Sequence, residues 1–322
     1  MIRMLSALVL SLIVAAPASA QDTAKPAAPP TIVQKVRDAI AQNDFKKAEK
    51  LVLDDMAANG TTPIAVEAFS WLGRGAVAAK NYDEAITYAN RTYAIVEEQL
   101  KTRKLDDEAR LPIALGAAIE VQALATAGQG NRSEAIVYLR RELDTYKGTS
   151  IVERLNKNVN LLGLEGTPAL PIESAEWIGP ARASLASLKG KPVVLYMWAH
   201  WCSDCKIAGP LLEGLVSKYK ASGLTIVAPT KLYGYVAQRK PATPQEELAY
   251  IAETRDKFYP WLKDYAIPVS DNVFAQYGVS TTPTLVFIDR AGNVTRYNPG
   301  RLPLEQLEPL FQAIAAPLGS AK

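Results

Sequence analysis

Two cysteines stand three residues apart in the stretch WAHWCSDCK, which runs from Trp198 to Lys206. They are the only cysteines of the chain, and the same stretch holds its only histidine, His200. Two thiols at this spacing could form a redox pair, supply half of a metal site or form a structural disulfide. A structural disulfide is the weakest of these interpretations, because a disulfide that encloses only Ser203 and Asp204 removes little entropy from the unfolded chain.

A redox role requires one thiol that ionises and a partner within disulfide reach. Cys202 follows an apolar run of strand length, Pro192 to Trp198, and the chain from Asp204 to Lys220 has amphipathic helical spacing. Cys202 is therefore predicted at the first turn of a helix, where unpaired N–H groups favour the thiolate. The i, i+3 spacing puts Cys205 beneath it on the same helical face. We expect Cys202 to be the exposed attacking thiolate and Cys205 to resolve the mixed disulfide.

The elements that must hold this pair follow a βαβ pattern that begins near Ala183. The expected strands are 192–198, 224–229, 284–289 and 294–297, and the expected helices are 204–220, 243–263 and 303–315. Residues 290–293 are expected to form the hairpin turn between the last two strands. This order predicts a mixed four-stranded sheet with helices on both faces.

The cysteine stretch, preceded by Leu188-Lys189-Gly190-Lys191-Pro192, resembles the active-site segment of thioredoxin-like proteins of the TlpA/ResA type, which are exported thiol–disulfide oxidoreductases. A second segment, YGVSTTPT from Tyr277 to Thr284, resembles the family's YGV…TPT motif, in which the proline is cis. Pro210 matches the helix-kinking proline that thioredoxins carry five residues after the second cysteine. The resemblance covers roughly residues 165–318 and implies a thioredoxin-like fold for that half.

The same resemblance implies the roles of the site residues. Cys202 and Cys205 would form the redox-active disulfide, with Trp201 beside the nucleophile. Thr282 and Pro283 would bind an extended substrate segment through the main chain, as a short added strand. The implied substrates are disulfide-containing exported proteins, and the implied electron donor is a membrane-bound thiol–disulfide reductase. Neither a cofactor nor a metal is expected.

Three positions depart from the family pattern. Tyr196 stands where thioredoxin has a buried aspartate, and Ala208 stands where the TlpA/ResA type has a glutamate. The proton acceptor of the resolving thiol is therefore left open. Asp204 replaces the proline that usually precedes the second cysteine. Ser203 and Asp204 are expected to modulate the pair, because a nearby carboxylate disfavours the thiolate and so favours a reductant over an oxidant.

Two further features near the site have open interpretations. His200 is expected at an exposed rim position rather than in a catalytic role. The connection from the cysteines to Pro283 is longer than in thioredoxin, and it includes a basic, tyrosine-bearing segment at residues 231–243, KLYGYVAQRKPAT. This segment could edge the substrate groove or serve as a solvated connection.

The first half of the chain, residues 31–163, is predicted to be helical. A phrase recurs in it at Asn43–Ala48, Asn81–Ala85 and Asn131–Ala135, each time between an alanine-rich apolar helix and a second amphipathic one. The small alanine lets the two helices approach closely, and the polar residues ahead of it can cap the second helix. The pattern resembles degenerate tetratricopeptide-type hairpins, and an unrelated helical bundle is the alternative.

The N-terminus reads as a secretory signal. Residues 1–20 combine Arg3, an uncharged apolar run and a small-x-small end at Ala18-Ser19-Ala20, and the Pro-rich residues 21–30 read as a flexible leader. We expect a periplasmic or secreted protein with no membrane span after signal cleavage. With 36 basic and 33 acidic side chains, the net charge is +3, which gives no argument for a nucleic-acid partner.

The sequence thus predicts a helical-hairpin domain at 31–163 followed by a thioredoxin-like α/β domain at 164–322, acting as an exported thiol–disulfide oxidoreductase that reduces protein disulfides. The alternatives are a disulfide oxidase or isomerase of the same fold, a non-catalytic interaction scaffold, and Cu(I) binding by the thiol pair.

Overall fold

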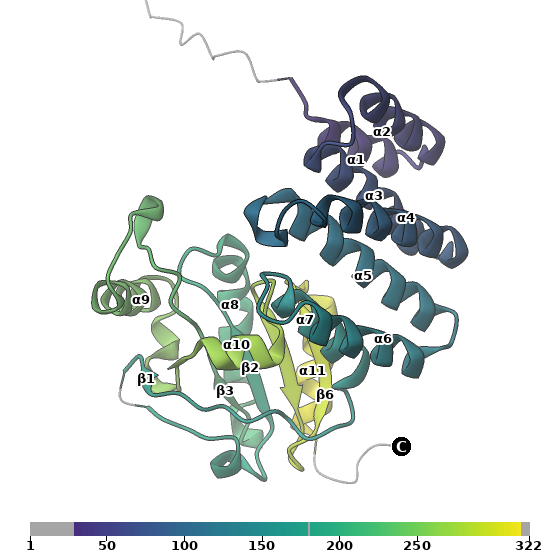
Figure 1. The fold of residues 1–322 in the computed structure, drawn as a ribbon. Coiled ribbons are helices and arrows are strands. Elements are labelled where there is room, and N and C mark those ends of the chain that lie inside the picture. Colours follow the sequence, from purple (N-terminus) through teal and green to yellow (C-terminus); the bar gives the residue numbers. More distant parts are fainter. Residues whose placement is uncertain (1–28, 180, 317–322) are drawn as a thin grey trace, which may run out of the picture.

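The computed structural model describes residues 29–179 and 181–316. The predicted signal peptide and nearly all of the predicted leader lie outside these residues. The described chain consists of a helical part followed by a part built around a mixed sheet, as the sequence predicts (Figure 1).

The helical part is a series of packed helices that runs from α1 to α7. Its elements are α1 (Ile32–Ala41), α2 (Phe45–Asn59), α3 (Pro63–Ala78), α4 (Tyr82–Leu100), the short 3-10 helix η1 (Leu105–Asp107), α5 (Arg110–Gly128), α6 (Arg132–Thr145) and α7 (Val152–Gly163). Consecutive helices pack against one another, and the series descends from α1 and α2 at the top of Figure 1 to α7 beside the sheet.

The recurring alanines occupy equivalent places in this part. Ala48, Ala85 and Ala135 each lie in the first turn of α2, α4 and α6, and each is fully buried. A larger side chain there would separate the paired helices, which explains why the sequence repeats the small residue. Of the three predicted caps, Asp44 accepts the N–H of Lys47, whereas the other two make no side-chain cap bond. The tetratricopeptide assignment remains a prediction.

Helix α5 is relevant to the expectation that no membrane-spanning segment follows the signal peptide. By length and composition this helix could cross a membrane, with a mean hydropathy of 1.4. Ten of its residues are buried, and it packs between α3, α4 and α6. Its apolar character is therefore that of the core helix of the helical part.

The second part holds the predicted four-stranded sheet. Its main elements are β1 (Glu176–Trp177), β2 (Val193–Met197), α8 (Ser203–Lys218), β3 (Thr225–Val227), α9 (Pro244–Phe258), β4 (Pro268–Val269), α10 (Asp271–Tyr277), β5 (Thr284–Ile288), β6 (Val294–Pro299) and α11 (Leu304–Ala315). The short 3-10 helices are η2 (Ala186–Leu188), η3 (Lys220–Ser222), η4 (Ala237–Arg239) and η5 (Pro260–Asp264). The strand order is β3-β2-β5-β6, with β2 parallel to β3 and antiparallel to β5. Helix α10 and the small β1–β4 pair were not predicted.

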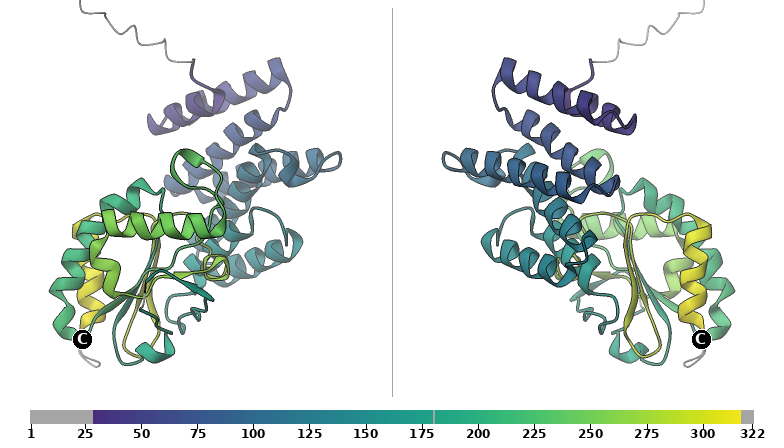
Figure 2. Two further views of the ribbon diagram at one scale, coloured as in Figure 1. Left: turned by 90° about the vertical axis from the view of Figure 1, so that its left-hand side faces the viewer. Right: turned by 90° about the vertical axis from the view of Figure 1, so that its right-hand side faces the viewer.

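Both faces of the sheet are covered, because alternate residues of a strand point to opposite sides. Val194, Tyr196 and Trp198 pack with the apolar residues of α8 and α11, while Val193 and Leu195 pack with those of α10. Figure 2 shows α8 and α11 side by side on one side of the sheet. The apolar run before Cys202 is therefore a buried central strand, which fixes where the cysteine stretch emerges.

Helix α7 joins the two parts. Asn156 and Asn160 donate side-chain hydrogen bonds of 3.1 and 2.9 Å to backbone carbonyls at the end of α10. The glycine that ends α10, Gly278, has a φ of +62°, and a Cβ there would lie 2.0 Å from the backbone nitrogen of Lys157. α7 therefore rests directly on the segment that leads, four residues later, to Thr282.

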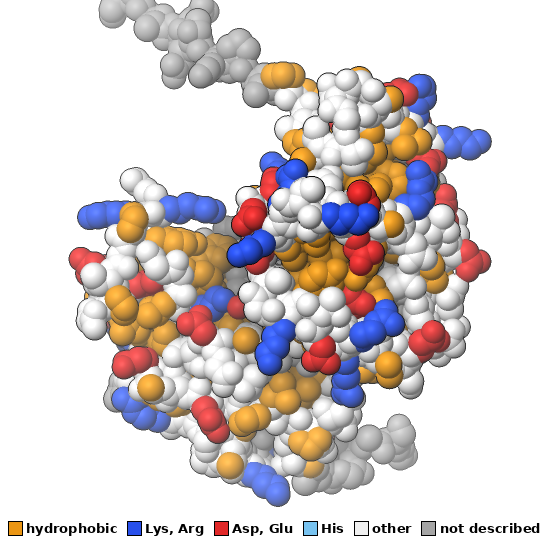
Figure 3. Space-filling view, viewed as in Figure 1, with side chains coloured by type: hydrophobic (Ala, Val, Ile, Leu, Met, Phe, Trp, Pro, Cys, Tyr) orange, Lys and Arg blue, Asp and Glu red, His pale blue; other side chains and the backbone are white. Residues whose placement is uncertain are grey.

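A charge cluster fastens α7 to α5. The Glu120 carboxylate accepts hydrogen bonds from Arg154 (3.0 Å), Lys157 (2.6 Å) and Asn158 (3.1 Å). Burial acts to raise the pKa of Glu120, but the charges and hydrogen bonds of Arg154 and Lys157 bring it down to about 2. Elsewhere the surface charge is mixed: on the face shown in Figure 3, basic and acidic side chains are interspersed.

Candidate active site at the start of α8

Cys202 is the N-cap residue of α8. Its Sγ accepts the backbone N–H of Cys205 at 3.0 Å, so the first turn of the helix points an unpaired donor at the sulfur, as predicted. The two cysteines form a disulfide, with their Cα atoms 5.2 Å apart. The hydrogen bond and the helix dipole both favour negative charge on Cys202 once the disulfide is reduced.

The cis proline lies where the resemblance implies. The Thr282–Pro283 peptide bond is cis, and the carbonyl oxygen of Thr282 lies 3.5 Å from Cys202 Sγ. The carbonyl of Pro283 accepts the N–H of Gly300 at 2.8 Å, which ties this turn to the end of β6. The structure therefore brings together three of the expected site residues from two distant segments.

Cys202 is less accessible than predicted. In the disulfide form its residue surface is 3% exposed and that of Cys205 is 0% exposed, because the Cys202 sulfur lies against the Thr282 carbonyl. Trp201 is 47% exposed. A visiting chain would therefore meet the indole of Trp201 before it reached the sulfur.

Asp204 has a partner that no local sequence pattern indicates. Its carboxylate lies 3.5 Å from the Nε of Arg301, which follows β6, and both side chains are largely exposed. Arg301 offsets part of the negative charge that Asp204 places near the cysteine pair. Ser203 is exposed at the start of the helix.

Tyr196 and Ala208 occupy the places of the two carboxylates that related proteins carry. Tyr196 is fully buried in β2, and its hydroxyl donates to the backbone carbonyl of Cys205 at 2.9 Å. Burial raises its pKa well above the ordinary value, so the phenol stays protonated. It therefore supports the backbone of Cys205 and does not replace a carboxylate as proton acceptor.

His200 is not at an exposed rim, so that expectation was wrong. It is 1% exposed, and its Nε2 lies 3.0 Å from Oε1 of Glu247, which is fully buried in α9. The residue is covered because α9 and the segment before it fold over the end of β2. Burial lowers the pKa of His200, although the neighbouring Glu247 acts in the opposite direction.

The segment at residues 231–243 borders the site. The Glu247 carboxylate accepts the backbone N–H groups of Tyr233 (2.6 Å) and Gly234 (2.8 Å), which fixes the start of this segment. The ring of Tyr233 lies edge-on to Trp201, with centroids 5.4 Å apart. Of the two interpretations that the sequence leaves open, the structure thus favours an ordered edge beside the cysteines over a solvated connection.

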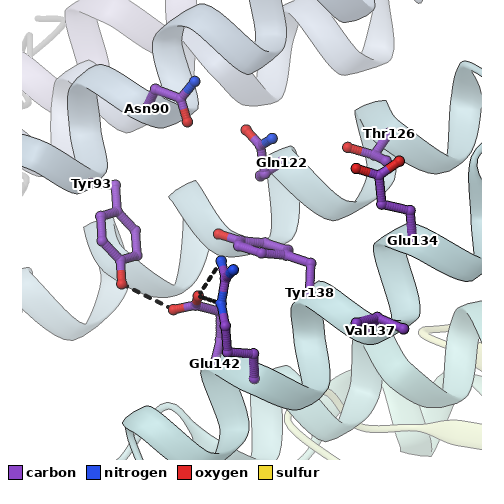
Figure 4. Close-up of a pocket in the computed structure, with 9 residues that line it drawn as sticks. Asn90, Tyr93, Gln122, Thr126, Glu134, Val137, Tyr138 and Glu142 are labelled. Carbon is purple, nitrogen blue, oxygen red and sulfur yellow. Dashed lines mark hydrogen bonds and ion pairs between the residues drawn. The ribbon is translucent and has the colours of Figure 1, made fainter.

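Two features lie apart from this site. Within residues 29–179 and 181–316 no group of three or more His, Cys, Asp or Glu side chains is placed to hold a metal ion. A hollow of about 540 Å³ lies on the helical part between α4, α5 and α6. At its edge Tyr93 and Arg141 both donate to the buried Glu142 (Figure 4).

Comparisons with known proteins agree with this geometry. The family model of the thioredoxin-like domain matches residues 180–315. Thioredoxin-like protein YneN of Bacillus subtilis (strain 168) is 26% identical over 163 residues, which are 51% of this chain and 87% of YneN. Thiol-disulfide oxidoreductase ResA of Bacillus cereus is 29% identical over 133 residues, which are 41% of this chain and 69% of ResA.

Among solved structures, a thiol:disulfide interchange protein of the thioredoxin family from Chlorobium tepidum TLS is similar over 47% of this chain and 97% of its own, with 20% identity and a TM-score of 0.38. The sheet, the Cys202–Cys205 pair and the family match define the second part as a thioredoxin-like domain. The relatives of this domain include thiol–disulfide oxidoreductases of the ResA type and the thioredoxin-like protein YneN, and the chain carries a helical N-terminal part in addition.

Proposed function

We propose that the protein is an exported reductase that opens disulfides in other exported proteins through a Cys202/Cys205 dithiol–disulfide cycle. The observation that carries this proposal is the position of the Cys202 sulfur. It accepts an N–H from the first turn of α8 and lies 3.5 Å from the main chain just before the cis proline. A sulfur placed in this way can ionise at the helix end and meet an extended substrate segment.

The cycle balances as a two-electron exchange. In the reduced enzyme, the Cys202 thiolate attacks one sulfur of the substrate disulfide and forms a mixed disulfide, and the other substrate sulfur leaves as a thiolate. Cys205, after losing its proton, attacks the Cys202 sulfur and releases the second substrate thiolate. The substrate gains two electrons and the enzyme is left with the Cys202–Cys205 disulfide.

The neighbouring residues would align the substrate. An extended segment beside Thr282 and Pro283 could add to the main chain as a short strand, with its disulfide above Cys202. Trp201 would cover one side of the mixed disulfide and keep water partly away. These roles rest on the placement of the residues around the sulfur and on the family resemblance.

Export and the electron source complete the proposal. The signal-like residues 1–20 support a periplasmic or secreted location, where disulfides persist. In such a compartment the enzyme disulfide must be reduced again after each turnover, so we propose a membrane-bound thiol–disulfide reductase as the donor.

The catalytic claim is tested by the reduction of insulin disulfides in the presence of dithiothreitol. The wild-type protein should accelerate insulin precipitation, and Cys202→Ser should abolish the acceleration because no attacking sulfur remains. Cys205→Ser should instead accumulate a mixed disulfide with insulin that dithiothreitol releases. Lys189→Gln, at the opposite end of β2 from the cysteines, serves as the control. Equal activity of wild type and Cys202→Ser would contradict the proposal.

The direction of electron flow is tested by the midpoint potential of the Cys202–Cys205 couple. A reductase should lie near the value of thioredoxin, about −270 mV, rather than near that of the oxidase DsbA, about −120 mV. Equilibration with glutathione or dithiothreitol redox buffers gives the value. A potential close to that of DsbA would assign the protein to disulfide formation instead.

A further inference from the structure

A hollow of about 370 Å³ lies between Trp201 and the tip of segment 231–243. Its walls include the rings of Tyr235 and Tyr250 together with Trp201. Lys206 and Arg239 also line it. Trp201 and Lys206, which line the hollow, directly flank the two cysteines in the sequence. The tip of the segment stands above α9 in Figure 1.

His200 packs against the two tyrosine rings that form walls of the hollow. Its ring contacts those of Tyr235 and Tyr250 edge-on, with centroids 5.5 and 5.3 Å apart. The hydrogen bond between His200 and Glu247, 3.0 Å long and buried at both ends, fixes the imidazole in turn. The hollow is therefore a built feature, assembled on the residue that lies two positions before Cys202.

The backbone of the tip is also defined. The N–H of Val236 donates to the carbonyl of Lys240 at 2.9 Å, which closes the tip into a turn. Within it Gln238 and Arg239 have φ values of +55° and +58°, a left-handed conformation that is uncommon for residues other than glycine. Consecutive residues in this region cost free energy, and such conformations gather at functional sites. This turn places the Arg239 side chain at the mouth of the hollow.

The charges around the hollow are of one sign. Lys206 Nζ lies over the Phe258 ring, 4.3 Å from its centroid, and Arg239 lies 6.0 Å from that of Tyr235. In the described part of the chain neither cation forms an ion pair, and the residues that line the hollow include no carboxylate. Glu247 is buried behind His200 and already accepts three hydrogen bonds. Two unpaired cations, one of them over the ring of Tyr235 in the wall of the hollow, attract a carboxylate.

We propose that this hollow binds an acidic side chain of the substrate, Asp or Glu, close in sequence to the cysteine that Cys202 attacks. The proposal rests on the reductase function above and adds a substrate class to it. Lys206 and Arg239 act as specificity residues: they take no part in the sulfur exchange, and they favour disulfides flanked by a negative charge. The aromatic walls exclude water from the ion pair and so strengthen it.

The test uses the full-length reduced protein and blocked hexapeptides that each contain one cysteine as a methyl disulfide. The peptides carry Glu, Gln or Lys two residues before or two residues after the cysteine and are otherwise identical. Stopped-flow tryptophan fluorescence gives the second-order rate constant of each reaction. We expect the Glu peptide to react about five-fold faster than the Gln peptide at one of the two positions, and the Lys peptide more slowly than both.

The variants Arg239→Gln and Lys206→Gln should each reduce the Glu-to-Gln ratio, and the double variant should bring it to about one. Lys189→Gln removes one charge at the far end of the sheet and should keep the wild-type ratio. Equal wild-type rates with Glu, Gln and Lys at both positions, alongside normal insulin reduction, would overturn the specificity and leave the reductase function standing. A ratio that survives in the double variant would overturn it as well. Failure to react with any peptide or with insulin would overturn both.

Discussion

Around Cys202, the helix start and two charged side chains act on the charge of one sulfur. The N–H of Cys205 and the start of α8 favour the Cys202 thiolate, and the Asp204 carboxylate opposes it. Arg301, 3.5 Å from Asp204, reduces that opposition. A residue about a hundred positions away thus takes part in the balance of charge near the sulfur.

This balance gives a prediction for Arg301→Gln. Without the guanidinium, the charge of Asp204 acts unopposed, so we expect the pKa of the reduced Cys202 to rise. A less stable thiolate makes the reduced enzyme less favoured, so the midpoint potential should become more negative. The pH dependence of alkylation by iodoacetamide reports the pKa.

Asp204→Asn is the matched variant and should move the pKa and the potential in the opposite directions. The double variant Asp204→Asn with Arg301→Gln should lie closer to the wild type than either single change does. If Arg301→Gln lowered the pKa or left it unchanged, the proposed balance would be incorrect.

At this scale the sequence predicts some residues better than others. The positions of Cys202, Cys205 and Pro283 follow from local motifs, and the structure places all three together. Arg301 and Glu247 were missed because their roles depend on tertiary contacts, and no local spacing marks them. The burial of His200 was missed for the same reason: its cover comes from α9, about 50 residues later.

Among the elements, α9 and the segment before it are held to the end of β2 by one buried pair of side chains. His200 and Glu247 connect the end of β2 to α9, and Glu247 also holds the backbone of Tyr233 and Gly234. The start of α9 carries a complete capping box, in which Thr243 and Glu246 satisfy each other's backbone N–H groups. The element is therefore fixed at its first turn and on its inner face.

Protonation of His200 should loosen this arrangement. Its pKa in the folded state lies below the ordinary value of 6.5, chiefly because of burial. Between these two values the unfolded chain binds more protons than the folded one, so stability is full above pH 6.5 and is lost as the pH falls below it. The His200→Gln variant has no imidazole to take up a proton on unfolding. As the pH falls below 6.5, its free energy of unfolding should therefore decrease less steeply than that of the wild type.

Urea unfolding curves at a series of pH values, from about 5 to about 8, measure the two slopes. The comparison is clean because the chain has a single histidine. Parallel curves for wild type and His200→Gln would show that the buried imidazole does not titrate with a lowered pKa.

The elements that the sequence predicted well are those with a strong local pattern. The buried strand β2, the hairpin of β5 and β6 and the terminal α11 each appear within a residue or two of their expected bounds. Helix α10 was missed because seven residues carry too little periodicity to separate a short helix from a loop. The β1–β4 pair has two residues a strand and no alternation to detect.

In the whole molecule, the two parts meet through α7. Its polar side chains bind the end of α10, Glu153 forms an ion pair with Lys231 at 2.6 Å, and Leu161 packs into the sheet core. One helix of the helical part thus contacts both segments that flank the cysteines: the one that leads to Thr282 and the one that leads to Tyr233.

Gly278→Ala tests this junction. A Cβ at this position would lie 2.0 Å from the backbone of Lys157, and the residue already has a positive φ. Both effects should lower the free energy of unfolding, by about 2 kcal/mol or more. Thermal or urea unfolding of the full chain measures the loss.

Gly214→Ala is the control for this change. Gly214 is an exposed residue within α8, and a Cβ there would have nothing within 4 Å. Alanine should stabilise the helix at this position by about 0.5 to 1 kcal/mol. Equal stabilities of Gly278→Ala and the wild type would mean that α7 can shift away from α10 without cost.

The close packing of α7 on α10 also determines which fragments of the protein can be studied separately. A protein fragment that begins at residue 164 would lack α7. Gly278 and the α10 carbonyls would then lose the surface that covers them. A fragment that begins just before Val152 would keep α7 on α10. It would lack α5, so Arg154 and Lys157 would lose their ion-pair partner Glu120. The second part therefore needs a redesigned helix surface if it is to be studied apart from the whole chain.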